Sequence, residues 1–265
     1  MSRKIGFIGV GNMGTAIIRG LASRDIEIHG IDLNTARLDE LHEELGLVVE
    51  TNAAEMAGKC DYVLLAVKPQ HAEPVVREIA PELNDSKCLI SICAGLTSQQ
   101  FREWTGNACP VVRVMPTTPA LVGEGVFAVC LDDAALTDDM KTSIPELFKG
   151  IGTVHELSEK LFDAYTGVIG SGPAYVFYFM EALIEAGVSL GLTRPQSVDM
   201  VKGLFLGSAK LAAESDHSVA ELREMVTSPG GTTIRGLMHF DRNAVRGTII
   251  DGAIEAYLRS VELGE

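Results

Sequence analysis

The first half of the chain alternates short apolar runs with longer stretches rich in Glu and Ala. Short runs of Val, Ile and Leu are typical of strands buried in a parallel sheet, and the polar-faced stretches between them fit helices. The predicted strands are Lys4–Val10, Ile26–Asp32, Leu47–Val49, Asp61–Val67, Cys88–Cys93 and Val111–Met115. This alternation predicts an α/β fold with a doubly wound, mostly parallel sheet.

The pattern changes near Leu157, where strand-like runs cease and helical periodicity begins. Thr193–Gln196 and Ser218–Glu221 both match a capping box, and each opens an apolar-periodic segment. We therefore predict two domains, a dinucleotide-binding sheet domain over 1–157 and an all-α substrate-binding and dimerisation domain over 158–265.

The predicted helix that starts near Ala174 is apolar on nearly every side apart from Glu181 and Glu185. A helix that is hydrophobic all round needs cover on all sides, which a small domain rarely supplies. We expect a second subunit to provide that cover. The alternative is burial against the first domain, which is less favoured because that sheet has its own helices. The two glutamates argue against a membrane span.

Three glycines, Gly9, Gly11 and Gly14, form a G-x-G-x-x-G motif between the first strand and the first helix. In that setting the first glycine permits a tight turn, the second lets a pyrophosphate approach the backbone, and the third allows close helix packing. Asp32 ends the second strand about 20 residues further on, where a carboxylate accepts hydrogen bonds from an adenosine ribose. The motif predicts a Rossmann-type dinucleotide site, the alternative being a glycine-rich turn without a ligand.

In an open parallel sheet the ligand binds beyond the carboxyl ends of the strands. That rule places Ala66–Pro69, Ile92–Gly95 and Met115–Ala120 along the cofactor crevice. Lys68 fits either a phosphate or nicotinamide contact or a solvated lysine before a proline turn, and its spacing does not decide between them.

The charge balance, 22 Lys and Arg against 36 Asp and Glu, gives a net charge of −14. Such a charge repels phosphate backbones, so no nucleic-acid partner is expected. The stretch after the first residues is broken by glycines, Asn12 and Arg19, which makes it a poor signal peptide. A cytoplasmic protein is predicted.

The cysteines and histidines carry no pattern of a metal site or a nucleophile. The five cysteines lie in apolar or small-residue surroundings without C-x-x-C spacing, and we predict buried thiols. The six histidines lie in polar or loop-like settings without an obvious carboxylate partner, so most are expected at the surface.

Thr227–Gly236, TSPGGTTIRG, interrupts the helical half. By itself it fits a turn between two helices. It is also one of five segments that together resemble the pyrroline-5-carboxylate reductase family, the enzymes of the last step of proline synthesis. These segments are Phe7–Gly14, Ala66–Pro69, Met115–Ala120, Gly170–Phe177 and Val226–Ile234. Thr117 departs from the asparagine expected in the third.

The resemblance implies reduction of 1-pyrroline-5-carboxylate to L-proline by NADPH or NADH, and it implies two sets of site residues and no metal. The cofactor set is Gly9, Val10, Gly11, Asn12, Met13, Gly14, Asp32, Asn34, Asn52, Ala66, Val67, Lys68, Pro69, Ile92, Cys93 and Ala94. The substrate set is Glu159, Met225, Ser228, Gly230, Gly231, Thr232 and Thr233. The Thr233 hydroxyl would hydrogen-bond the ring nitrogen, and free N–H groups of Gly231, Thr232 and Thr233 would hold the carboxylate at the start of a helix.

The sequence also allows expectations about the choice of cofactor, the assembly and the alternative functions. Asp32 meets the 2′-phosphate of NADP as a like charge and favours NADH, whereas Arg37 in the next turn could pair with that phosphate. The resemblance implies a homodimer and further assembly, commonly into a decamer of five dimers. The alternatives are a related NAD(P)H-dependent imine or β-hydroxyacid reductase and a non-catalytic dinucleotide-binding redox sensor. Lys202 and Lys210 lack the G-x-x-x-K context of the β-hydroxyacid enzymes.

Overall fold

The structure, a computed structural model, describes residues 3–22 and 24–264. These residues form two compact units. The first runs to Gly170 and takes in the chain from Ala256 onward, and the second is Ser171–Glu255. The units are described separately below. The domain boundary predicted after residue 157 marks a change of sequence pattern and stays a prediction.

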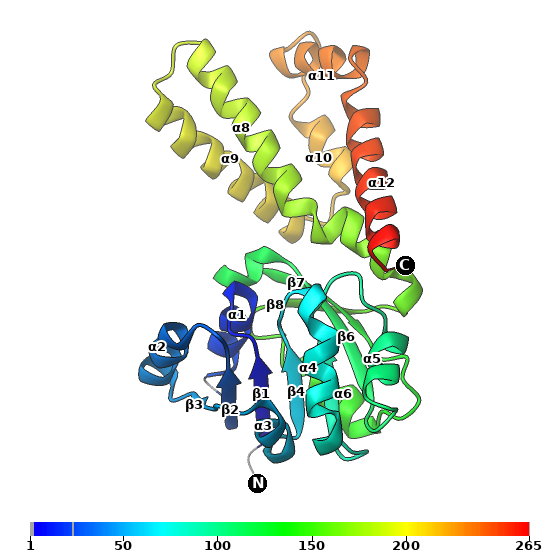
Figure 1. Cartoon of the computed structure of the whole chain (residues 1–265). Coiled ribbons are helices and arrows are strands. Elements are labelled where there is room, and N and C mark those ends of the chain that lie inside the picture. The colour runs from blue at the N-terminus through cyan, green and yellow to red at the C-terminus, as the bar shows by residue number, and fades with distance from the viewer. Residues whose placement is uncertain (1–2, 23, 265) are drawn as a thin grey trace. The chain divides into compact units, whose positions relative to one another are not determined.

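The first unit contains an eight-stranded sheet of order β3-β2-β1-β4-β5-β6-β7-β8 (Figure 1). All neighbouring strands pair in parallel except β6 and β7, which pair antiparallel. The strands are β1 Arg3–Ile8, β2 Ile26–Ile31, β3 Val48–Val49, β4 Tyr62–Leu65, β5 Cys88–Ser91, β6 Val111–Pro116, β7 Gly125–Cys130 and β8 Gly152–Glu156. The predicted parallel strands are confirmed, and β7 and β8 extend the sheet beyond them.

Helices pack on the two faces of this sheet. They are α1 Asn12–Leu21, α2 Thr35–Leu45, α3 Ala53–Lys59, α4 Ala72–Ile79, α5 Ser98–Trp104, α6 Asp138–Glu146 and α7 Phe162–Tyr165. Shorter turns are η1 Pro69–His71, η2 Ala80–Glu82, η3 Thr118–Val122, η4 Glu159–Leu161 and the π-helical η5 Thr166–Gly170. Because strand side chains alternate between faces, Phe7 joins Ile17 of α1 in one core, whereas Val63 joins Met56 of α3 in the other.

The strand order determines where a ligand can bind. β1 lies between β2 and β4, so the chain winds outward in one direction from β1 through β2 to β3 and in the other from β4 onward. Such a switch in winding leaves a crevice beyond the carboxyl ends of the central strands. The glycine motif follows β1 at this edge, and the segments after β4 and β5 follow the neighbouring strands.

The second unit is helical. It comprises α8 Gly172–Ser189, α9 Arg194–Glu214, α10 Val219–Met225, α11 Thr232–Arg242 and most of α12 Val245–Gly264. α8 and α9 lie side by side as a helical pair (Figure 1). Both predicted capping boxes are present, with Thr193 and Ser218 each bonding the N–H three residues on.

α8 is only partly covered in the described chain, because it packs against α9 but none of its residues is buried. Val176 is 43% exposed, Phe177 58% and Tyr178 74%. Large aromatic surface of this kind marks an interaction site. The expectation that α8 needs cover from outside the chain therefore agrees with its exposure.

The helical run Glu159–Ser189 is long and apolar enough to cross a membrane by length and composition, because it contains an 18-residue window with a mean hydropathy of 1.3. The expectation that the two glutamates of α8 argue against a membrane span stays a prediction, because length and composition alone are weak evidence for a span.

Candidate cofactor and substrate sites

The three glycines of the motif have different surroundings. Gly9 has a φ of +98°, and a Cβ there would lie 2.6 Å from the Ala66 carbonyl oxygen. A Cβ on Gly14 would lie 2.6 Å from the Gly9 carbonyl oxygen, whereas a Cβ on Gly11 would meet nothing within 4 Å. Gly9 and Gly14 are therefore needed for packing within the protein. Gly11 faces open space, as a backbone that receives a pyrophosphate should.

The start of α1 is suited to an anion. The Thr15 N–H donates to the Gly11 carbonyl at 2.8 Å. Among the described residues, the N–H groups of Asn12, Met13 and Gly14 have no partner. Unpaired N–H groups at the positive end of a ten-residue helix attract a phosphate. The residues present thus fit a dinucleotide pyrophosphate.

Asp32 connects the end of β2 to the glycine loop. Its Oδ2 accepts from the Val10 N–H at 2.6 Å, and its Oδ1 accepts from the Asn34 N–H at 2.8 Å. Asn34 in turn caps α2 by accepting the Arg37 N–H at 3.2 Å. The Arg37 guanidinium lies 3.5 Å from a Glu40 oxygen, so in this structure it is paired along its own helix.

The segments after β4 and β5 lie against each other. The Ile92 N–H donates to the Leu65 carbonyl at 3.1 Å, and the Cys93 thiol donates to the Val67 carbonyl at 3.3 Å. Lys68 is exposed at the start of η1, beside Pro69. The structure therefore brings the predicted cofactor residues from these two segments together at one edge of the sheet.

Asn52 follows β3 and caps α3, where its side chain accepts the Glu55 N–H at 3.0 Å. Thr117 is 3% exposed, and its hydroxyl accepts the Val126 N–H at 2.9 Å. The threonine found in place of the expected asparagine thus fixes β7 against the turn after β6. The Thr117 side-chain oxygen therefore has a structural role.

The cysteines are buried free thiols, as predicted. Burial raises the pKa of Cys60 to about 12 and that of Cys93 to about 11, so neither is a thiolate at neutral pH. In the described ranges, no three or more His, Cys, Asp or Glu side chains are grouped so that they could hold a metal ion.

Five of the six histidines are exposed, as expected, and His29 is the exception, because it is buried and has carboxylate partners. It is 4% exposed, with Nε2 2.8 Å from Glu27 Oε1 and Nδ1 2.8 Å from Glu50 Oε1. Burial raises the pKa of Glu50, but hydrogen bonds from Lys59 and His29 outweigh it and hold that pKa below its ordinary value. The sequence could have indicated the contact with Glu27, which lies two residues earlier on the same face of β2. The contact with Glu50 arises because β3 pairs with β2.

The loop Thr227–Gly231 enters α11 in a tight turn. Gly230 has a φ of +70°, and a Cβ on Gly231 would lie 2.4 Å from the Ser228 hydroxyl. The predicted free N–H of Gly231 is wrong, because it donates to the Ser228 carbonyl at 3.1 Å to close the turn. Among the described residues, the N–H groups of Thr232 and Thr233 have no partner.

Met225 and Thr233 lie at the two ends of this loop, since Met225 ends α10 and Thr233 is in the first turn of α11. Both side chains are exposed. The eleven-residue α11 directs its positive end toward the loop. Two free N–H groups and a hydroxyl at that end are suited to a small carboxylate.

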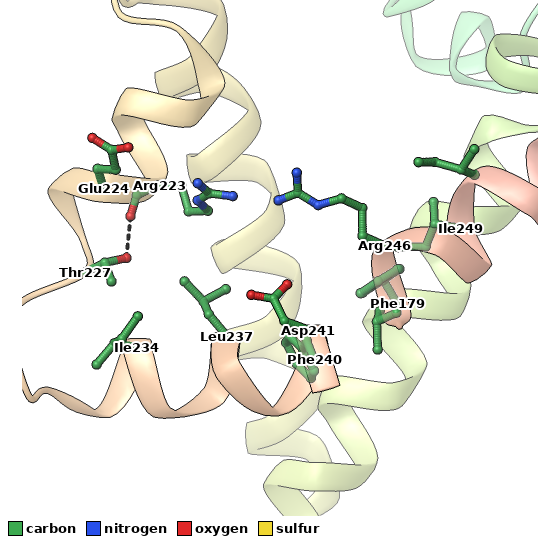
Figure 2. A pocket seen from close by; sticks show the side chains of 12 residues that line it. Phe179, Arg223, Glu224, Thr227, Ile234, Leu237, Phe240, Asp241, Arg246 and Ile249 are labelled. Carbon is green, nitrogen blue, oxygen red and sulfur yellow. Dashed lines mark hydrogen bonds between the residues drawn. The ribbon is translucent and has the colours of Figure 1, made fainter. Parts of the chain in front are cut away.

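A hollow of about 480 Å³ lies beside this loop within the helical unit (Figure 2). Its wall is mostly apolar and includes Phe179, Leu237 and Phe240, with Arg223 and Arg246 entering from α10 and α12. The Thr227 hydroxyl donates to the Arg223 carbonyl at 2.6 Å and so joins the loop to α10. An apolar wall of this kind suits side chains better than a polar substrate.

Glu159 lies in η4 of the first unit, and its carboxylate is bonded within that unit. Oε1 accepts from the Ser98 N–H at 2.6 Å and from the Arg113 guanidinium at 2.8 Å. Neither partner was singled out from the sequence. Arg113 was detectable as a charged residue inside the apolar run Val111–Met115, since a buried arginine needs a carboxylate.

Two family models match the chain. One, described as pyrroline-5-carboxylate reductase dimerisation, matches residues 159–263. The other, described as NADP oxidoreductase coenzyme F420-dependent, matches residues 4–95. The first range contains the whole helical unit, and the second contains the glycine motif and the segments after β4 and β5.

Relatives match over the full length. A pyrroline-5-carboxylate reductase of Methanosarcina acetivorans is 35% identical over 268 residues, which cover 100% of this chain and 99% of that protein. The structure is similar to that of a pyrroline-5-carboxylate reductase from Coxiella burnetii, with a TM-score of 0.91, 32% identity and 100% of both chains covered. It is also similar to pyrroline carboxylate reductase of Plasmodium falciparum with NADP bound, with a TM-score of 0.86 and 35% identity over 99% of this chain and 98% of that chain.

Proposed function

The chain belongs to the pyrroline-5-carboxylate reductase family, and from that membership we propose that it reduces 1-pyrroline-5-carboxylate to L-proline with NADPH or NADH. The observation that carries the proposal is the full-length match at 35% identity to a reductase of this name. The open glycine loop and the turn before α11 agree with it, because the reaction needs both a dinucleotide and an anionic substrate.

Residues at the carboxyl edge of the sheet hold the cofactor in this proposal. The N–H groups of Asn12 and Met13 bind the pyrophosphate over Gly11, and the segments Ala66–Pro69 and Ile92–Ala94 line the crevice. When bound, the reduced nicotinamide supplies the hydride that the imine carbon accepts. The protein orients the nicotinamide ring.

The turn before α11 binds the substrate. The N–H groups of Thr232 and Thr233 donate to the carboxylate at the positive helix end, and the Thr233 hydroxyl accepts a hydrogen bond from the protonated ring nitrogen. Gly230 and Gly231 keep the approach free of side chains, while Met225 and Ser228 shape the loop. Among the described residues we assign no separate acid or base, so the chain contributes orientation and a favourable field for the charged imine.

For the cofactor, we propose that NADH supports turnover at least as well as NADPH. The Asp32 carboxylate lies at the end of β2, where it faces a ribose as an acceptor and a 2′-phosphate as a like charge. The Arg37 guanidinium is paired with Glu40 at 3.5 Å, and ordering it on a phosphate would cost up to about 2 kcal/mol in side-chain entropy.

For assembly, we propose a cytoplasmic homodimer formed by residues 158–265, with dimers assembling further into a decamer. The exposed aromatic side chains of α8 and the apolar hollow of the helical unit are the surfaces that a second copy would cover. The match to a dimerisation model supports the dimer. The proposed division into domains, 1–157 and 158–265, follows the start of that match at residue 159.

The test is a cofactor-oxidation assay with 1-pyrroline-5-carboxylate, run beside other cyclic imines and 2-keto and 3-keto acids. We expect oxidation of NADH or NADPH with the pyrroline and formation of proline, with the other compounds at least tenfold slower. Preference for another imine or for a keto acid would favour a related reductase. A folded sample that binds a cofactor and turns over nothing would favour a redox sensor.

A further inference from the structure

The segment Ile92–Thr97, here named the β5–α5 loop, is held by residues far from it in the sequence. Its start is fixed to the sheet, where the Cys93 N–H donates to the Ser91 hydroxyl at 3.2 Å. Its middle turns at Gly95, which has a φ of +77°. Its end is Thr97, which caps α5. In the proposed function its residues Ile92–Ala94 line the cofactor crevice.

Glu159 holds the far end of this loop. The Ser98 N–H is the first donor of α5 and has no intrahelical partner, because a helix leaves its first N–H groups unpaired. Glu159 Oε1 accepts it at 2.6 Å, while Thr97 caps the later N–H of Gln100 at 3.2 Å. Ser98 is 5% exposed, so the carboxylate is its only available acceptor among the described residues.

Arg113 fixes the carboxylate in turn. Its guanidinium donates to the same Oε1 at 2.8 Å and lies 4.8 Å from the centre of the Phe162 ring. The Arg113 side chain is 9% exposed. A buried guanidinium between a carboxylate and an aromatic ring has little freedom, so it keeps Glu159 in one position. The main chain of Glu159 is held as well, by its N–H bond to Asp132 at 3.0 Å.

The end of α12 supports the middle of the loop. A Cβ on Gly95 would lie 3.3 Å from Leu263 Cβ, and a Cβ on Gly264 would lie 3.1 Å from the Gly95 carbonyl oxygen. The Ser260 hydroxyl, in a residue 6% exposed, donates to Asp163 at 2.7 Å and anchors this helix end. The loop is thus held between the sheet, Glu159 and the last turn of α12.

We propose that Glu159 is a positioning residue that fixes the β5–α5 loop for cofactor binding, and that the end of α12 supports the same loop. This inference rests on the proposed function, and it replaces the substrate-binding role that the family resemblance implies for Glu159. Loss of the carboxylate leaves the Ser98 N–H and the Arg113 guanidinium without their acceptor. The loop then gains freedom that cofactor binding has to remove.

The test is the cofactor Kd without substrate, measured by calorimetry with NADPH and NADH on the full chain. We expect Glu159→Ala to raise the Kd about tenfold and Glu159→Gln, which keeps an acceptor oxygen, to raise it about threefold. Ser260→Ala should raise it about twofold to threefold. The control is Glu156→Ala, which removes the same charge from the exposed end of β8.

The KM for the pyrroline at saturating cofactor separates positioning from substrate binding. Positioning predicts a KM within about twofold of the wild type for Glu159→Gln. An unchanged cofactor Kd in Glu159→Ala with a raised KM would overturn the proposal, and so would an equal rise of Kd in Glu156→Ala. If Glu159→Ala does not fold, the Kd of Glu159→Gln decides in the same way. Because binding is measured without turnover, an inactive wild type would reject the proposed function and leave this test intact.

Discussion

Replacing Asp32 tests how the chain chooses between NADH and NADPH. Its two carboxylate oxygens hold the Val10 N–H at 2.6 Å and the Asn34 N–H at 2.8 Å. Asp32→Asn removes the charge and keeps one acceptor oxygen, whereas Asp32→Ser removes both acceptors from reach. Asp32→Asn therefore tests the effect of the charge on cofactor choice. Asp32→Ser tests in addition the loss of the hydrogen bonds that order the glycine loop.

The magnitude follows from these contacts. Two unit charges about 4 Å apart repel by about 1 kcal/mol in water, and the second charge of a 2′-phosphate increases this. Removing the Asp32 charge should therefore raise the NADPH-to-NADH efficiency ratio about fivefold to twentyfold. In Asp32→Ser, the loss of two hydrogen bonds at a half-buried position should cost a further 1–3 kcal/mol, roughly, in affinity for both cofactors.

The assay is the initial rate with each cofactor, giving kcat/KM for both, beside the Kd of each cofactor. The control is Asp39→Asn, which removes a charge from the exposed surface of α2 and should leave the ratio unchanged. A wild type that prefers NADPH tenfold or more would show that Asp32 does not face the ribose. Arg37 would then be the residue to replace, because releasing it from Glu40 lets it reach a phosphate.

Three further predictions concern the substrate, the acid sensitivity and the assembly. Thr233→Val should lower kcat/KM for the pyrroline about tenfold to a hundredfold, because the hydroxyl's hydrogen bond, worth about 1–3 kcal/mol, is lost. The cofactor Kd should not change. Thr232→Val should have a much smaller effect, because Thr232 contributes its backbone N–H. Glu50→Gln should lower the unfolding free energy at neutral pH, and its difference from wild type should shrink as the pH falls below 4.5. Burial raises the pKa of Glu50, but hydrogen bonds from Lys59 and His29 lower it overall. The stabilisation by Glu50 is therefore present above pH 4.5 and is lost as the pH falls through the folded-state pKa. An equal difference in unfolding free energy between variant and wild type at neutral pH and below pH 4.5 would contradict this. Light scattering at micromolar concentration should show a dimer or a larger assembly, and a monomer would refute the dimer.

Local pattern was enough to predict the main helices and strands. The parallel strands, both capping boxes and the glycine motif are confirmed because each depends on residues close together in the chain. Gly9, Gly11 and Gly14 illustrate this best, since a strand, a turn and a helix start fix their roles within one βα unit. The last two strands in chain order, β7 and β8, were not predicted. Their pairing depends on an antiparallel turn after β6 and on exposed residues in β8.

Tertiary structure decided what the polar side chains do. His29 is buried between two carboxylates because β3 lies beside β2, and Glu159 meets Ser98 because η4 lies beside the start of α5. The N–H of Gly231 is occupied because the turn closes on Ser228. In each case the side chain or N–H group could form a hydrogen bond with several kinds of partner. Because a hydrogen bond acts only within about 3 Å, the fold decides which partner is close enough. Backbone periodicity is a property of neighbours in sequence, whereas a hydrogen-bond partner is a property of neighbours in space.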